Sequence, residues 1–334
     1  MARVSLQDVA SSLGVSTASV SYVLNGKDKD VGISEALAER IRDGAKAMNY
    51  KPNSIAKALR SSHTETIGLI VADISNPFFG HLAFHIQEYA EKYGYSVIIT
   101  NTNEKSDLME QRISILKSHQ VDGFIIVSTE HGEKQIEELI KDKIPVVLVS
   151  RYFEGIDVSY VGINNYQATI EATNLLLNLN CRRIAYIGHK HSLLEVQDRK
   201  KGYMEAMTNR KLYDPKLIKE VDFWTVADET QNAVMELLGN NEKVDGFFFA
   251  SRAIAVHALE KLASLKFEIP RDIKVVVFSN FINSFGCFGL LNPIPYIKQP
   301  ISEMGKRAVE LIIGHITQKD APIVREELQT KLVS

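Results

Sequence analysis

The chain has 334 residues, of which 45% are hydrophobic, and its formal net charge at pH 7 is −2. A chain of this length can bury roughly two or three cores. Its two cysteines, Cys181 and Cys287, are too few for a disulfide framework and indicate reduced thiols. No apolar run is long enough to cross a membrane, and no secretory signal peptide precedes the first helical pattern. We therefore expect a cytoplasmic protein with no membrane partner.

Charge is distributed unevenly along the chain. Residues 1–62 hold nine Lys or Arg and six Asp or Glu, a formal charge of +3, whereas the remaining residues carry −5. A modestly basic N-terminal segment attached to an acidic body is typical of a segment that contacts phosphate.

The N-terminal segment begins with an amphipathic helical pattern over residues 6–13. Four apolar residues share one face at the 3.6-residue period: Leu6, Val9, Ala10 and Leu13. Ala10 is small, so a second helix can cross closely above it. Gly14 follows, where a tight turn needs a residue that tolerates positive φ.

A second short helix is predicted directly after this turn. Ser16 has a side chain suited to an N-cap, and a helix over residues 17–24 places Val20 and Val23 inward. A small residue, a glycine and β-branched residues at these offsets indicate a helix-turn-helix rather than an ordinary surface hairpin of helices.

The body of the chain follows the polar linker SSHTET at residues 61–66. Strand-like runs alternate with helical patterns around residues 78–92, 107–119 and 133–142, and the strand-like runs cover residues 66–72, 95–100, 123–127, 144–150, 158–164, 183–188, 217–222, 246–250 and 273–278. This alternation predicts parallel sheets covered on both faces. The run VDGFIIV at Val121 recurs as VDGFFFA at Val244, which suggests two similar lobes with a ligand cleft between them.

These segments together resemble the LacI/GalR family of transcriptional regulators over essentially the whole chain. The motifs that carry the resemblance are DVASSLGVSTASVSYVLNG, MNYKPNSIAKALR, TIGLIVADISNPFF, VDGFIIV, RKKGY and IKQPISEMGKRAVELI. The resemblance implies an α/β fold with a three-helix helix-turn-helix headpiece (1–50), a hinge helix and linker (51–62), and a two-lobed core (63–334). The core would be periplasmic-binding-protein-like, with doubly wound parallel sheets.

In such a core the chain crosses between the lobes three times, and we expect the crossings near Gly162, Asn292 and Pro322. The first lobe would then comprise about 63–162 and 293–322, and the second about 163–292 and 323–334. The resemblance also implies a homodimer. We expect no tetramer-forming helix, because the chain stops at LQTKLVS, just past its last predicted strand.

The predicted function is a DNA-binding regulator, most simply a repressor, of a pseudo-palindromic operator. Thr17, Ala18 and Tyr22 project from the second helix as base readers in the major groove, with Tyr22 standing where the family usually has arginine. Further phosphate or base partners are Ser5, Ser16, Ser19, Ser21 and Asn25, with surface capping as the alternative for Ser5 and Ser19. In the hinge the expected contacts are Asn53, Lys57 and the wedge residue Leu59.

The cleft residues follow from the resemblance as well. They are Ser75, Phe78, Phe79, Arg151, Asn164, Arg199, Ser251, Arg252, Ser279 and Gln299. Serine or asparagine stands where the family has acidic or amide residues, so the pocket is expected to lack carboxylates. Three arginines then favour a sugar phosphate or sugar acid over a neutral sugar. The alternative is a degenerate site, with control by a protein partner.

Other kinds of site find little support in the sequence. The pairs His81–His85 and His189–His191 have no third ligand in sight, so we expect solvated surface histidines and no metal or cofactor. No catalytic set was found, so we expect no enzyme. A solute-binding protein without gene control would explain the two lobes but leaves residues 4–60 without a role.

Overall fold

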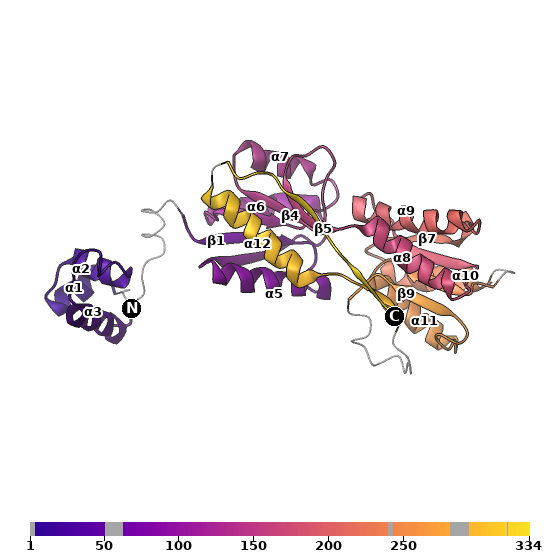
Figure 1. Ribbon diagram of the computed structural model, residues 1–334, viewed down its shortest axis with the longest axis horizontal. Coiled ribbons are helices and arrows are strands. Elements are labelled where there is room, and N and C mark those ends of the chain that lie inside the picture. Colours follow the sequence, from indigo (N-terminus) through magenta and orange to yellow (C-terminus); the bar gives the residue numbers. More distant parts are fainter. Residues whose placement is uncertain (1–3, 51–62, 240–242, 281–293, 319) are drawn as a thin grey trace. The chain divides into compact units, whose positions relative to one another are not determined.

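The computed structural model describes residues 4–50, 63–239, 243–280, 294–318 and 320–334. The chain divides into an N-terminal unit that ends at Thr64 and a core that begins at Glu65 (Figure 1). Among the described residues, no helix is long and apolar enough to span a membrane.

Within residues 4–50, the N-terminal unit folds into a bundle of three helices, α1 (Leu6–Leu13), α2 (Thr17–Leu24) and α3 (Glu35–Ala47). Their buried side chains form one small core: Val9, Ala10, Val20, Val23, Ala38, Ile41 and Ala45. Gly14 ends α1 in the left-handed conformation with φ +66°, and the Ser16 side chain caps α2. The turn and the cap are therefore confirmed as predicted.

The first lobe of the core is built on a six-stranded sheet in the order β11-β5-β4-β3-β1-β2. Its strands, all parallel to their neighbours, are β1 (Thr66–Val71), β2 (Ser96–Asn101), β3 (Gly123–Ile126), β4 (Val146–Val149), β5 (Ser159–Ile163) and β11 (Arg325–Leu328). Its helices are α5 (Pro77–Lys92), α6 (Ser106–Ser118), α7 (Glu133–Lys141) and α12 (Ile301–Thr317).

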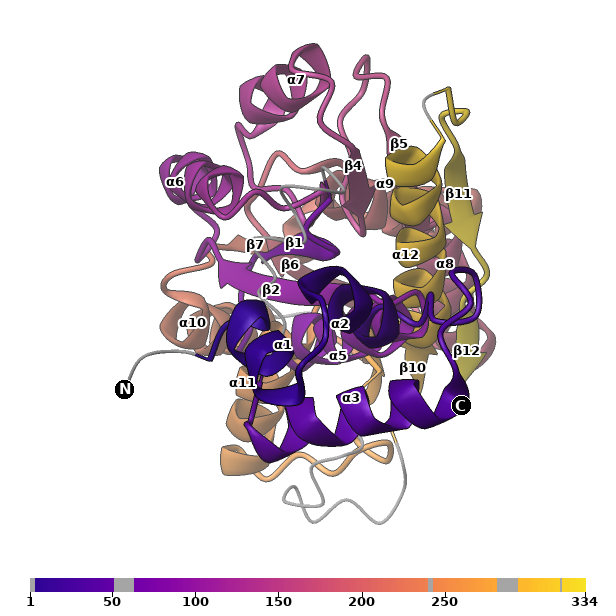
Figure 2. The same cartoon turned by 90° about the vertical axis from the view of Figure 1, so that its left-hand side faces the viewer.

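The helices cover both faces of this sheet because its strands are apolar on both sides. Ile67, Leu69 and Val71 of β1 pack with α5 and α12, whereas Ile70 of the same strand packs with α6 and α7. Figure 2 shows α6 and α7 on the side of the lobe away from α12. The alternation follows the two-residue period of a strand.

The second lobe repeats this plan with the strand order β12-β10-β9-β8-β6-β7. Its strands are β6 (Ile184–His189), β7 (Ile218–Val221), β8 (Gly246–Phe249), β9 (Lys274–Val277), β10 (Tyr296–Lys298) and β12 (Lys331–Val333), of which only β12 runs antiparallel. Its helices are α8 (Asn165–Asn178), α9 (Leu194–Asn209), α10 (Val226–Gly239) and α11 (Arg252–Ser264), with one 3-10 turn, η1 (Pro215–Leu217). The two VDGF runs lead into β3 and β8, which occupy equivalent inner positions in their sheets.

Two of the three predicted crossings between the lobes are misplaced. β10 pairs with β9, so the chain is in the second lobe at β10 and the crossing follows Lys298. The predicted place near Asn292 lies outside the described residues. β11 pairs with β5, so the last crossing follows Leu328 and not Pro322. The sequence concealed β11 because the strand reads REEL, a polar edge strand without alternating apolar residues.

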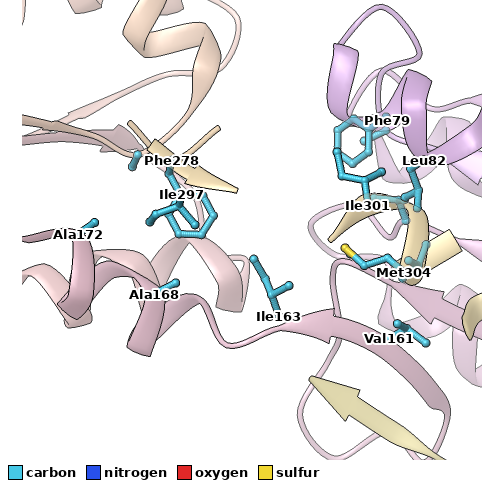
Figure 3. Packing of buried hydrophobic residues seen from close by; sticks show 14 of the residues in the cluster. Phe79, Leu82, Val161, Ile163, Ala168, Ala172, Phe278, Ile297, Ile301 and Met304 are labelled. Atoms are coloured by element: carbon cyan, nitrogen blue, oxygen red, sulfur yellow. The ribbon is translucent and has the colours of Figure 1, made fainter. Parts of the chain in front are cut away.

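The first crossing was predicted near Gly162 and lies at the end of β5. One apolar cluster continues through this region, with Ile301 and Met304 on one side and Phe278 and Ile297 on the other. Figure 3 shows Ile163 between these two groups. The crossing strand is therefore anchored in the apolar interior next to the place where the lobes meet.

Candidate functional site

The second helix of the N-terminal unit presents two distinct faces. Val20 and Val23 are buried against the other helices, whereas Thr17, Ala18 and Tyr22 are exposed, Tyr22 with 43% of its surface. The three residues predicted to read bases thus share the accessible part of α2 and none is needed for the core. Their role in base recognition stays a prediction.

The serines and asparagine predicted to contact DNA make local hydrogen bonds at helix ends. Ser5 forms a reciprocal capping box with Asp8, and Ser16 Oγ accepts from the Ser19 amide at 3.0 Å. Asn25 Nδ2 donates to the Ser21 carbonyl at 2.7 Å. These bonds fix the ends of α1 and α2. The hinge residues Asn53, Lys57 and Leu59 lie outside the described residues.

The core contains a cavity of about 120 Å³ lined by both lobes. Eight of the ten residues predicted for the cleft line it: Phe78, Phe79, Arg151, Arg199, Ser251, Arg252, Ser279 and Gln299. Asn76 and Pro77 start α5 at its wall, with Asn76 Oδ1 accepting from the Phe78 amide at 3.1 Å. Phe79 belongs to the apolar core as well, since only 6% of it is exposed.

Two residues predicted for the cleft are not among those that line the cavity. Ser75 is exposed, and its hydroxyl donates to Asp73 at 2.7 Å. Asn164 is the N-cap of α8 and accepts from the Gln167 amide at 2.8 Å, so its amide serves the helix. Its neighbour Asn165 contacts Arg199, a residue of the cavity wall, because Arg199 Nε donates to Asn165 Oδ1 at 2.9 Å.

The expectation that the pocket lacks carboxylates is wrong. Glu104, from the loop between β2 and α6, and Glu195, from the first turn of α9, both line the cavity. Their side chains are only 5% and 6% exposed. Sequence reasoning missed them because neither stands at a position where the family resemblance suggested an acid. The carboxylates of the cavity come from the loop before α6 and from α9, and not from the positions where the family has acidic residues.

Arg151 forms ion pairs with both of these acids. Its Nη1 and Nη2 donate to the two carboxylate oxygens of Glu104 at 2.6 and 2.7 Å, and Nη1 also reaches the Ser128 carbonyl at 2.8 Å. Its Nε lies 2.9 Å from Glu195 Oε1, on the opposite lobe. Burial alone would lower the pKa of Arg151, but the charges and hydrogen bonds of Glu104 and Glu195 outweigh it and raise that pKa.

The two acids respond differently to this environment. Burial tends to raise the pKa of Glu104, but the charge and hydrogen bonds of Arg151 prevail and hold it below its ordinary value. For Glu195, burial is the stronger influence, and its pKa is raised despite Arg151 and Arg199. The ionised form of Glu104 is therefore stabilised by Arg151, whereas the ionised form of Glu195 is only partly compensated for its burial.

Arg199 forms a second polar centre on the other lobe. Besides the bond to Asn165, its Nη1 donates to the Ala250 carbonyl at 2.8 Å. Its guanidinium lies 3.8 Å from the centre of the Phe278 ring, a cation–π arrangement. These contacts hold the planar guanidinium in one orientation.

His189 is not the solvated surface histidine that was expected. It lines the cavity, where Nε2 lies 2.9 Å from Ser251 Oγ and the ring packs against Phe223 with centroids 5.7 Å apart. Burial, with a contribution from the charge of Arg199, lowers the pKa of His189 to about 4. The histidine is therefore neutral at pH 7. Phe223 and Phe278 are further lining residues that the sequence had not indicated.

A second polar link joins the lobes beside the cavity. Glu130, which follows β3, accepts from the backbone amide of Ser192 at 2.8 Å and also from its hydroxyl. The Nε2 atom of His191 lies 3.5 Å from the same carboxylate. Within the described ranges, no group of three or more His, Cys, Asp or Glu could hold a metal ion.

A helix-turn-helix unit followed by two α/β lobes around a polar cavity defines a DNA-binding regulator with a ligand-binding core. Residues 5–53 match the bacterial regulatory proteins of the lacI family, and residues 64–332 match the periplasmic binding proteins and sugar binding domain of the LacI family. The chain belongs to the LacI family. It is accordingly a DNA-binding transcriptional regulator and not an enzyme.

Individual relatives agree along the full length. The ribose operon repressor of Halalkalibacterium halodurans is 31% identical over 98% of this chain and 95% of its own. The solved complex of the transcriptional regulator CelR with cellobiose is 26% identical, covers 99% of both chains and has a TM-score of 0.73. The lac repressor dimer bound to operator and the anti-inducer ONPF is similar in fold, with a TM-score of 0.86 at 20% identity over 100% of this chain and 98% of that one.

Proposed function

We propose that the chain is a repressor that acts in the cytoplasm as a homodimer on a pseudo-palindromic operator, and that a sugar-like molecule between its lobes modulates this binding. The observation that carries the proposal is the cavity, which is lined by charged, amide and aromatic side chains of both lobes. It accompanies a helix-turn-helix unit whose second helix exposes side chains that the small core does not need.

The composition of the cavity suits a polyhydroxyl ring. Phe78 and Phe223 offer aromatic side chains, and Arg199 and Glu195 offer a fixed donor and a fixed acceptor. Apolar walls with a few convergent polar groups are the usual construction of small-molecule sites. Relatives point the same way, since one regulates a ribose operon and another was solved with cellobiose.

On DNA, the recognition residues are Thr17, Ala18 and Tyr22, assisted by Ser5, Ser16, Ser21 and Asn25. The hinge residues Asn53, Lys57 and Leu59 complete the interface, with Leu59 as the wedge in the minor groove. Two headpieces of a dimer read the two half-sites, which explains a pseudo-palindromic operator. A ligand changes DNA affinity to the extent that it prefers one arrangement of the lobes.

The test is a selection of operator DNA from random sequence by the full chain, followed by gel-shift titration with and without sugars. Removing the N-terminal unit up to Thr64 should abolish binding and leave a folded core, because the two units are separate. Binding by the full chain should weaken steeply with salt as counterions are released.

The ligand arm uses Arg199→Ala. This variant should lose the response to sugar and keep ligand-free operator affinity, because Arg199 belongs to the core, where it bonds Asn165 and the Ala250 carbonyl. Operator binding that survives removal of the N-terminal unit would refute the assignment of the DNA interface. Operator binding that no sugar alters would favour a regulator controlled by a protein partner.

A further inference from the structure

Glu195 stands where the two lobes meet and uses its two carboxylate oxygens differently. Oε1 lies 2.9 Å from Arg151 Nε across the cleft. Oε2 is buried and has no hydrogen-bond partner among the described residues. Because the residue lines the cavity and is only 5% exposed, Oε2 is an acceptor left for whatever the cavity holds.

Arg151 is held mainly by residues of the first lobe. Three of its hydrogen bonds, two to Glu104 and one to the Ser128 carbonyl, stay within that lobe. Its bond to Glu195 is the one that crosses to α9. Separating the lobes therefore breaks the pair of Arg151 with Glu195 while leaving the pair with Glu104 intact. Among the described residues, Glu195 provides the hydrogen-bonded ion pair between this arginine and the second lobe.

We propose that Glu195 couples occupancy of the cavity to closure of the lobes and selects against anionic ligands, with Oε1 holding Arg151 and Oε2 accepting a hydroxyl of a neutral ligand. The inference rests on the proposed function, because it takes the cavity as the effector site. It adds the residue that joins ligand to closure, and it reverses the expectation of an anionic effector.

The ligand preference follows from what a carboxylate can do. An ionised carboxylate only accepts hydrogen bonds, and a hydroxyl that donates to it makes a short, charge-assisted bond. A phosphate or carboxylate at the same place would bring a like charge against a buried acid without a proton between them. Of the three arginines expected to attract an anion, Arg151 already has two carboxylate partners.

The coupling follows from the sharing of one carboxylate. A hydroxyl bound to Oε2 favours the ionised form of Glu195, and that form is the one that holds Arg151. Conversely, the pair with Arg151 keeps Oε2 charged and oriented for the ligand. The two bonds therefore strengthen each other only while the lobes are together, which is the reciprocity that an allosteric link requires.

Closure can be measured without any ligand, because Trp224 is the only tryptophan of the chain. It lies on the second lobe, 59% exposed, and the Lys105 ammonium of the first lobe stands 5.4 Å from its ring centre. Its fluorescence therefore reports whether the lobes are together. The experiment uses the full chain, with Glu195→Gln as the test and Glu205→Gln, an exposed position on the same helix α9, as the matched control.

Glu195→Gln should shift the Trp224 emission to longer wavelength and increase its quenching by acrylamide, while Glu205→Gln behaves as wild type. In an Arg151→Met background, adding Glu195→Gln should have no further effect. Emission and quenching that are the same in wild type and Glu195→Gln, or an equal effect in both backgrounds, would overturn the coupling.

Selectivity is tested with matched probes, glucose against gluconate and ribose against ribose phosphate, by thermal denaturation. Neutral probes should raise the melting temperature of wild type more than their anionic counterparts, and Glu195→Gln should narrow that difference. Anions that stabilise wild type as well as neutral sugars do, or an unchanged difference in the variant, would overturn the inference. Retention of the same preparations on operator DNA keeps this failure distinct from a failure of the proposed function.

Discussion

The DNA-binding unit and the cavity are both functional sites, but they are assembled in opposite ways. Every described residue assigned to the DNA interface lies between Ser5 and Asn25, on two adjacent helices and their caps. The cavity draws its walls from residues as far apart as Asn76 and Gln299. A site built on one local motif has its geometry fixed by neighbours in sequence. A site built by long-range packing depends on which loops the fold brings together.

The same contrast separates the kinds of polar contact in the two sites. The capping side chains Ser5, Ser16 and Asn25 at the ends of α1 and α2 are exposed, and their hydrogen bonds span three or four residues. In the cavity, the decisive contacts are buried ion pairs between residues 44 and 47 positions apart, Arg151 with Glu195 and with Glu104. Removing one of these polar side chains should therefore reduce stability more in the cavity than in the headpiece, and should disturb residues farther away along the chain.

The largest expected effect is that of Arg151→Ala. Removing the arginine leaves Glu104 and Glu195 buried without their counter-ion, which costs about 3–5 kcal/mol in the free energy of unfolding of the core. Chemical denaturation followed by Trp224 fluorescence measures it. The matched control is Arg271→Ala, whose side chain is 67% exposed and whose loss should leave stability nearly unchanged. Equal costs for the two variants would contradict the buried ion-pair network.

A comparable change in the headpiece is Ile41→Ala. Ile41 is fully buried in the small core between α1, α2 and α3. Truncation should cost about 2–5 kcal/mol, much of what so small a unit can supply. Operator binding should be lost while the thermal transition of the core stays in place. A core transition that moves with this variant would mean that the two units do not unfold independently.

A third effect depends on pH and arises from His189. Its pKa is about 4 in the folded chain because of burial and the charge of Arg199, against 6.5 for the ordinary side chain. Between these values the unfolded chain binds a proton that the folded chain does not, so stability falls as pH drops from about 6.5 towards 4. The loss amounts to about 3 kcal/mol for this group.

The measurement compares wild type with His189→Gln across that pH window, since other groups titrate there as well. The wild type should lose more of its free energy of unfolding than the variant, and above about pH 6.5 the difference between them should no longer vary. Parallel pH profiles for the two proteins would show that His189 is not held neutral in the cavity.

These contrasts explain how much of the molecule could be predicted from its sequence. The helices of the headpiece, the Gly14 turn and the Ser16 cap follow from local spacing and were confirmed. The alternation of strands and helices in the core was confirmed for the same reason. The wrong predictions concern segments whose local sequence pattern does not indicate their structure. One is β11, whose REEL sequence forms a strand by pairing with β5.

The cavity shows the same limit at the level of side chains. Phe79, Arg151 and Arg199 could be expected there because their motifs resemble those of the family. Glu104 and Glu195 could not, since their importance comes from a partner about 44 to 47 residues away that only the fold supplies. The sequence shows the positive charge of Arg151, but it does not show that Glu104 and Glu195 lie beside it and neutralise that charge.

The smallest predicted effect concerns base reading by Tyr22. A tyrosine hydroxyl makes a single hydrogen bond, whereas arginine can bridge the two major-groove acceptors of guanine, a pairing that discriminates by about 1–3 kcal/mol. Tyr22→Arg should therefore shift the selected operator towards guanine at one symmetric pair of positions. Since Tyr22 is 43% exposed and lies outside the headpiece core, stability should hardly change. Selection from random DNA by both proteins measures the shift. The same consensus from both would mean that base recognition resides in Thr17, Ala18 and the hinge, and that α2 is a less complete reader than its exposed face suggests.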